Sequence, residues 1–69
     1  MNKALYEYWK NKIVKFLKRR KKPISIDEFA KKLKVNKLTL YRWISILELK
    51  GVVSTEINND RRKYVWLRK

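Results

Sequence analysis

Residues 25–51 most constrain what this chain can fold into, because their apolar side chains recur at helical spacing in two segments separated by a short turn. We expect one helix over about residues 26–34 and a second over residues 37–50. Asn36 stands at the end of the turn, where its side chain is a favourable N-cap for the second helix. Gly51 ends that helix, because glycine readily adopts the positive φ angle that commonly follows a helix.

The start of the first of these helices carries two further signals. Ser25 followed by Glu28 fits a capping box, in which each side chain accepts a hydrogen bond from the backbone N–H of the other residue. Ile24 and Phe29 stand at the positions of a hydrophobic staple on either side of that cap. In the second helix, the side chains expected to face the core are Leu40, Trp43, Ile44 and Leu47.

A longer amphipathic helix is predicted over about residues 2–21, ahead of this unit. The side chains on its apolar arc are Leu5, Trp9, Ile13, Phe16 and Leu17, with Tyr6 beside them. Tyr8 and Val14 lie off that arc, either simply exposed or on a second surface that meets a partner. The cationic run 18–22 and Pro23 end the helix. Cations are favoured at a helix C-terminus, and five in succession also suit phosphate contacts.

Alternating patterns over residues 52–57 and 64–68 predict two β-strands, and residues 58–63 predict a hairpin tip that ends in three cations. A short strand is expected at residues 24–26. The strand face expected to lie over the helices carries Val53, Thr55 and Ile57. The other strand completes this face with one of two sets, Val65 and Leu67 or Tyr64 and Trp66. The pattern leaves both registers open.

Lysine and arginine dominate the charge, with 20 of them against 6 aspartate and glutamate residues and a formal net charge of +14. Such an excess opposes compaction by self-repulsion and favours a polyanionic partner, for which DNA, RNA and an anionic membrane surface are the candidates. Apolar residues make up 45% of the chain, including three Trp, four Tyr and two Phe, which is too many for a disordered basic tail. We therefore expect one folded domain over residues 1–69.

The chain has no cysteine and no histidine, which excludes disulfides and the usual structural zinc sites and removes the commonest catalytic groups. The acidic residues are scattered, and only Asp27 and Glu28 are adjacent. We therefore expect no catalytic residues, no metal site, no cofactor and no small-molecule ligand. The start at Met1 lacks a secretory h-region, and no apolar run reaches the roughly 18 residues of a membrane span. A cytoplasmic protein that does not enter a membrane is expected.

The order helix, short strand, helix, turn, helix, hairpin resembles that of the winged helix-turn-helix (HTH) superfamily of DNA-binding proteins. The sequence IDEFAKKL at residues 26–33, with its small residue Ala30, is similar to the family's first HTH helix. NKLTLYR at residues 36–42 resembles the start of a recognition helix, and LELKGVV at residues 47–53 resembles the exit into the wing. The resemblance covers essentially the whole chain. It implies an α+β fold of three helices with a C-terminal two-stranded hairpin wing.

For function, the resemblance implies a small DNA-binding protein, a transcriptional regulator whose second HTH helix enters the major groove of duplex DNA while the wing lies along the backbone or minor groove. The residues expected to read bases are Arg42, Tyr41, Thr39, Ser45 and Leu38. Arg42 can pair two acceptors of guanine, and Leu38 can contact a thymine methyl group. The residues expected at the DNA backbone are Lys37, Lys31, Lys32, Lys34, Arg61, Arg62 and Lys63. Further phosphate contacts are expected from Arg19, Arg20, Lys21 and Lys22. Lys37 and Thr39 also suit a phosphate because backbone donors in the first turn of a helix are unpaired.

Other functions stay open at this point. Leu38, Ile46 and Leu49 lie on or beside the helix face that should be polar, which suits a protein-interaction or assembly module in a nucleoprotein complex. A homodimer through the first helix or through Leu49 is one form of that alternative. The charge and the aromatic residues also suit an RNA or single-strand binder, although most aromatic residues fall on core-facing arcs. A membrane-surface role would take the apolar side of the first helix away from the core.

Overall fold

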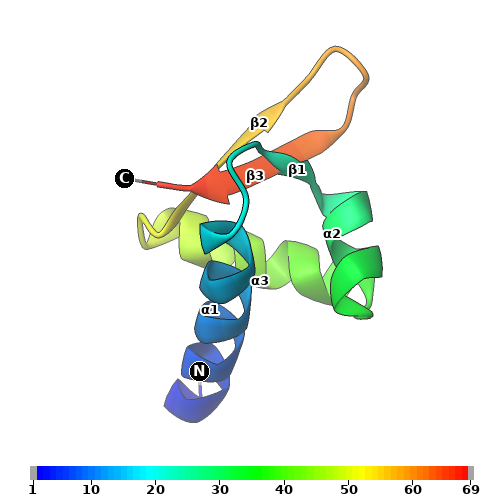
Figure 1. The fold of residues 1–69 in the computed structure, drawn as a ribbon. Helices are drawn as coiled ribbons and strands as arrows, with labels where there is room; N and C mark the ends of the chain where they lie inside the picture. Colours follow the sequence, from blue (N-terminus) through cyan, green and yellow to red (C-terminus); the bar gives the residue numbers. More distant parts are fainter. Residues whose placement is uncertain (1, 69) are drawn as a thin grey trace.

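A computed structural model describes residues 2–68 of the chain as three helices and one sheet (Figure 1). In chain order the elements are α1 (Lys3–Lys18), β1 (Ile24–Ser25), α2 (Ile26–Leu33), α3 (Lys37–Leu49), β2 (Val53–Ile57) and β3 (Lys63–Leu67). The strands are antiparallel and lie in the order β1-β3-β2, so that β1 extends the C-terminal hairpin to three strands. The predicted α+β fold and its element order are confirmed.

The core is one cluster to which every helix and every strand contributes. Phe29 of α2 is fully buried and stacks on Phe16 of α1, with ring centroids 4.7 Å apart. The other large side chains that are fully buried are Ile13, Ile24, Leu40, Ile44, Leu47, Val53 and Val65. Trp43, expected in the core, is partly buried and stacks on Trp9 at a centroid distance of 6.0 Å. Removing this apolar surface from water is the main stabilising contribution in so small a protein.

The sheet register selects one of the two sets of core residues that the sequence left open. Val65 at the centre of β3 and Val53 of β2 are fully buried, and Leu67 packs against the same cluster. Because side chains alternate along a strand, Tyr64 and Trp66 project from the opposite face of the sheet. The helices therefore cover the face that carries Val53 and Val65.

Two residues expected in the core lie at the surface instead. Ile57 is 67% exposed, because the end of β2 extends beyond the helices toward the hairpin tip (Figure 1). Leu5 is 48% exposed, because the first turns of α1 project away from the sheet (Figure 1). Periodicity assigned both residues to the correct side of their elements, but the elements are longer than the core that they cover.

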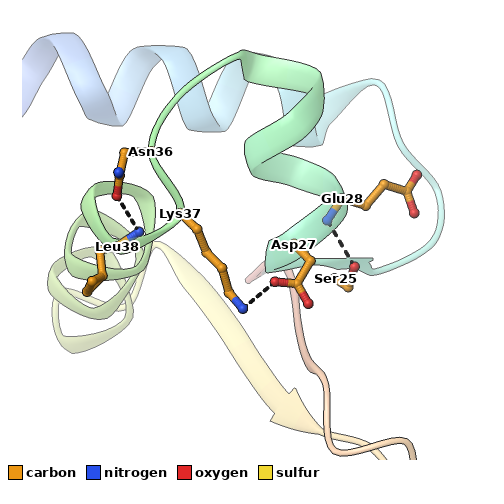
Figure 2. A network of polar contacts seen from close by, with 6 residues as sticks. All are labelled: Ser25, Asp27, Glu28, Asn36, Lys37 and Leu38. Atoms are coloured by element: carbon orange, nitrogen blue, oxygen red, sulfur yellow. Dashed lines mark hydrogen bonds and ion pairs between the residues drawn. The ribbon is translucent and has the colours of Figure 1, made fainter.

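The predicted starts of α2 and α3 are confirmed, and their ends agree to within one residue. The Ser25 hydroxyl accepts a hydrogen bond from the N–H of Glu28 at 3.2 Å. The Asn36 side chain accepts from the N–H groups of Leu38, at 2.8 Å, and Thr39, at 3.3 Å. The reciprocal half of the expected capping box is wrong, since the Glu28 carboxylate is exposed and points away from Ser25 (Figure 2). Ser25 is also a paired residue of β1, which already places its backbone in the sheet.

α1 ends at Lys18, short of the expected end near residue 21. The N–H groups of Arg19 and Arg20 donate to carbonyl groups three residues back, at 3.2 and 3.1 Å, which tightens the final turn. Pro23 disfavours helical geometry in the residue before it. The residues between the helix and Pro23 are needed to reverse the chain toward β1.

Gly51 controls how the chain leaves α3. Its φ angle is 77°, and its N–H donates to the carbonyl of Glu48 at 3.0 Å. The N–H of Val52 donates to the carbonyl of Leu47 at 2.9 Å, which completes a Schellman motif. A Cβ atom at this position would meet only the Arg68 guanidinium, 3.9 Å away. The backbone conformation, not crowding, therefore requires glycine here.

We predict that Gly51→Ala lowers the free energy of unfolding by about 1 kcal/mol. A left-handed conformation costs a residue with a Cβ atom roughly 1–2 kcal/mol, and alanine offsets part of this by restricting the unfolded chain. Urea unfolding followed by circular dichroism measures the change. Gly51→Asn is the matched control and should lose less, because asparagine adopts this conformation more readily. Equal stability of Gly51→Ala and wild type would contradict the assignment.

Candidate nucleic-acid interface

One side of α3 faces away from the core and carries all five residues expected to read bases. The core side of the helix holds Leu40, Ile44 and Leu47. On the outward side, Leu38 is 64% exposed, Tyr41 is 43% exposed, and Arg42 is also exposed. Thr39 and Ser45 are partly buried at the margins of this surface. Leu49, at the end of the helix, is 89% exposed.

Arg42 lies near the middle of the outward face of α3. Within residues 2–68 its guanidinium forms no ion pair with a carboxylate. A guanidinium is planar and carries five N–H donors, which allows it to bind two acceptors on one base edge. Among the five expected readers, Arg42 therefore has the chemistry best suited to distinguish bases.

Lys37, expected at a phosphate, is paired with a carboxylate from the preceding helix. Its ammonium contacts the Asp27 carboxylate, which connects the first turn of α3 to the first turn of α2 (Figure 2). The N–H groups of Leu38 and Thr39 are also bound, by Asn36. The expectation of unpaired backbone donors in this turn is therefore wrong for these two residues. A phosphate at the start of α3 would therefore find these two donors already occupied by Asn36.

Asp27 is the residue at this interface that the sequence did not single out as functional. The hydrogen bond from the Lys37 ammonium lowers the pKa of the Asp27 carboxyl group, and the charges of Lys37, Arg62 and Lys31 lower it further. Three cations, one each from α2, α3 and the wing, thus act on this one carboxylate. Asp27 lies in the first turn of a helix, where a carboxylate is expected to interact with the helix dipole. Nothing in the local sequence indicates its pairing with Lys37.

Two side-chain contacts hold the wing, formed by β2, β3 and their hairpin tip, against α3. Thr55 of β2 donates to the Glu48 carboxylate at 2.7 Å. Lys63 donates to the Tyr41 hydroxyl at 3.3 Å, and its ammonium lies 4.8 Å from the centroid of the Tyr41 ring. Lys63 is the first residue of β3, not part of the hairpin tip as expected. Its charge therefore lies at the junction of the wing and α3.

The hairpin tip has its own hydrogen bonds. The Asp60 carboxylate accepts from the N–H of Arg62 at 3.0 Å and from the Tyr64 hydroxyl at 2.8 Å. These two bonds lower the pKa of Asp60, and the bond to Asp60 raises the pKa of Tyr64. Arg61 adopts a left-handed conformation with a φ angle of 63°. The side chains of Arg61 and Arg62 are exposed, so the tip presents two cations to solvent.

The remaining expected phosphate contacts fall in two places. The first group, on α2 and in the turn after it, is exposed and consists of Lys31, Lys32 and Lys34. The second group follows α1 and consists of Arg19, Arg20, Lys21 and Lys22. A hollow of about 540 Å³ borders Arg20, Lys21 and Lys22 and includes no residue of α3. The structure therefore does not bring these three cations together with the α3 surface.

Residues 2–68 hold neither a group of side chains suited to a metal ion nor a helix that could span a membrane. These residues contain no group of three or more acidic, cysteine or histidine side chains that could hold a metal ion. No helix in the same part of the chain is long and apolar enough to cross a membrane.

Comparison with known families gives one finding. A family model described as an HTH domain matches residues 10–64, which is most of the 69-residue chain. The match extends from the middle of α1 to β3 and so includes α2, α3 and the wing. No curated protein and no solved structure matches the chain.

We predict that Lys37→Gln raises the pKa of the Asp27 carboxyl group toward its usual value near 3.8. Because the folded-state pKa of Asp27 is lowered, its ionised form stabilises the fold above the unfolded-state pKa. That contribution is lost as the pH falls through the folded-state pKa. Carboxyl ¹³C NMR titration of both proteins measures the change. Asp60 is the internal control, since its partners are Arg62 and Tyr64. An unchanged Asp27 pKa would show that the pair does not form.

Proposed function

Since the chain belongs to the HTH domain family, we propose that it is a transcriptional regulator that reads duplex DNA with α3 in the major groove. The family supports a DNA-binding role for the chain. The observation that carries the finer proposal is the exposed Arg42 on the outward side of α3, with the wing held beside that helix by Tyr41 and Lys63.

The dimensions of α3 suit this role. Its 13 residues span about 20 Å, and the major groove is wide enough to admit an α-helix. In the proposed complex Arg42 binds two acceptors of a guanine, and Leu38 contacts a thymine methyl group. Tyr41, Thr39 and Ser45 line the same side of the helix and contact neighbouring base edges.

The wing and α2 provide the proposed contacts to the DNA backbone. Arg61 and Arg62 at the hairpin tip bind phosphates of the backbone or the adjacent minor groove, and Lys63 binds at the junction with α3. The exposed cations of α2 and its turn, Lys31, Lys32 and Lys34, extend the same basic surface. Lys37 contributes less than a free lysine would, because Asp27 already neutralises part of its charge. The affinity for DNA then comes mainly from the wing and α2 on either side of α3, and the sequence preference comes from the centre of α3.

Self-association is the second candidate property, and the exposure of Leu49 favours it. A large apolar side chain that is 89% exposed suits contact with a second subunit or with another protein of a nucleoprotein complex. A homodimer through Leu49 or α1 would present two α3 helices to half-sites roughly one helical turn apart. Selection of bound duplexes from a random pool reveals such a dimer as a palindromic site.

The first test of the proposal is the salt dependence of duplex binding. The logarithm of the association constant should fall linearly with the logarithm of salt concentration, with a slope of about −0.9 for each phosphate contact. Arg61→Ala should reduce the magnitude of that slope by about one. Lys3→Ala is the matched control, because Lys3 is an exposed cation in the first turn of α1. Absence of duplex binding at low salt would end the proposal.

The second test separates base reading from backbone contact. Arg42→Ala should reduce the preference for a selected duplex over a random one by about 5- to 150-fold, since a bidentate contact to a base contributes about 1–3 kcal/mol of discrimination. Arg61→Ala should weaken binding to both duplexes equally. Fluorescence anisotropy with labelled duplexes measures both ratios. Equal losses on both duplexes for Arg42→Ala would remove the role of Arg42 as a base reader.

A further inference from the structure

The face of the sheet that points away from the helices carries two aromatic side chains that the core does not use. Tyr64 and Trp66 of β3 alternate with Val65, which is fully buried on the other face. The register places Glu56 opposite Tyr64 and Ser54 opposite Trp66. Neither Tyr64 nor Trp66 packs against the core cluster. The Tyr64 hydroxyl donates to Asp60, so it is the role of Trp66 that must be sought on this outer face.

Trp66 lines two hollows at the surface. The larger, of about 540 Å³, lies between the end of α1, the segment after it and the end of β3. The smaller, of about 270 Å³, lies over the outer face and is lined in part by Glu56, Asn58 and Tyr64. Both are lined by Lys22, Pro23 and Trp66, and the two hollows together are called here the outer groove. No residue of α3 lines it, and neither do Arg61, Arg62 and Lys63, the wing residues proposed to contact duplex DNA.

The two ends of the outer groove differ in charge, although Lys22 lines both. The larger hollow is lined by five cations, Lys18, Arg20, Lys21, Lys22 and Arg68. The smaller hollow adds the carboxylate of Glu56 and the amide of Asn58. Trp66 lies between the two ends, because it lines both hollows. A ligand that fits this arrangement has an anionic group, a flat central part and a hydrogen-bond donor at its far end.

Arg20 supplies a second observation at the cationic end. Its Nε atom is buried and has no hydrogen-bond partner within residues 2–68. A charged group that is partly removed from water without a partner is destabilising. An anion in the groove would bind the Nη atoms and not the buried Nε atom, and it would offset the lost hydration of the guanidinium charge, because charge-assisted bonds to guanidinium are among the strongest in proteins.

We propose that the outer groove binds a nucleotide. The base stacks on Trp66, the phosphate binds the cations that follow α1 together with Arg68, and amino groups on the base donate to Glu56. Base–aromatic stacking beside a cationic track is the usual basis of binding to unpaired nucleotides. An acidic peptide or a lipid headgroup would satisfy the cations, but neither would use Trp66 as a flat platform, and Glu56 would repel a second acidic group.

The nucleotide has two sources with the same chemistry, a free nucleotide and an unpaired nucleotide in a single strand. A volume of 540 Å³ falls within the roughly 300–1,000 Å³ of small-molecule sites. The protein would then hold duplex DNA on α3 and the wing, and a nucleotide on the opposite side of the sheet.

NMR titration of the full chain with adenosine 5′-monophosphate tests the proposal. The indole N–H of Trp66 and the backbone signals of Lys22 and Arg68 should shift, while those of Leu38 and Arg42 should not. Adenosine alone and inorganic phosphate alone should each bind at least about ten-fold more weakly, since each lacks one of the two contacts. Equal affinity for phosphate and for the nucleotide would overturn the proposal and leave an anion site only. Shifts confined to α3 would also overturn it.

Variants of Trp66 identify the stacking contact. Trp66→Leu should weaken nucleotide binding by about 5- to 150-fold, whereas Trp66→Tyr keeps an aromatic plane and should stay within a few-fold of wild type. Tyr8→Leu is the matched control, because Tyr8 is an exposed aromatic residue of α1 outside the groove. If Trp66→Leu does not fold, the shift pattern of the wild-type protein decides alone.

The same variants distinguish a free nucleotide from a nucleotide in a single strand, and they distinguish the outer groove from the α3 surface. One outcome is that a short single-stranded oligodeoxyadenylate binds and the free nucleotide does not. If that binding depends on Trp66, the proposed groove is supported and its ligand is an unpaired nucleotide of a strand. The proposal would be overturned if anionic vesicles or an acidic peptide bind in a way that depends on Trp66, while neither the free nucleotide nor the oligonucleotide binds. Trp66→Leu should leave duplex affinity unchanged, and Arg42→Ala should leave nucleotide affinity unchanged. Each proposal can thus fail without the other.

Discussion

The pairing of β3 with β1 is the interaction on which the rest of this structure depends, because it joins two segments that are distant in the chain. Ile24 lies opposite Val65, and both are buried in the core. The same pairing keeps Ser25 where it caps α2, and it directs β3 so that Lys63 reaches Tyr41 of α3. A chain of this size has room for one core only. The helices and the wing therefore cannot be placed independently of each other.

Some charged side chains stabilise the fold, and others stay exposed where they can contact partners. Three of the six carboxylates connect elements or order the hairpin tip: Asp27 with Lys37, Glu48 with Thr55, and Asp60 with Arg62 and Tyr64. Most cations stay exposed, and a net charge of +14 leaves strong self-repulsion that a polyanion would relieve. One group of cations lies around α3 and the wing, and another follows α1 and borders the outer groove.

Much of the fold could be predicted because its signals are local. The starts of α2 and α3 follow from their N-caps, and the end of α3 follows from Gly51, since a cap or a left-handed residue acts on its immediate neighbours. Predictions failed where a helix or strand extends beyond the part of the core that it packs against. Leu5 and Ile57 have the right periodicity and still lie in solvent, and α1 stops at Lys18 because the chain must turn back toward the sheet.

The sequence by itself determined the order of elements, the inward and outward sides of α3, and the cationic character of the surface. These follow from periodicity, caps and composition, which need no knowledge of distant residues. Only the tertiary structure decided that Val65 and not Tyr64 faces the helices, that Asp27 binds Lys37, and that Trp66 borders a cationic groove. Those outcomes depend on how separate elements dock. Docking is set by the shape of the shared core, and no local pattern encodes that shape.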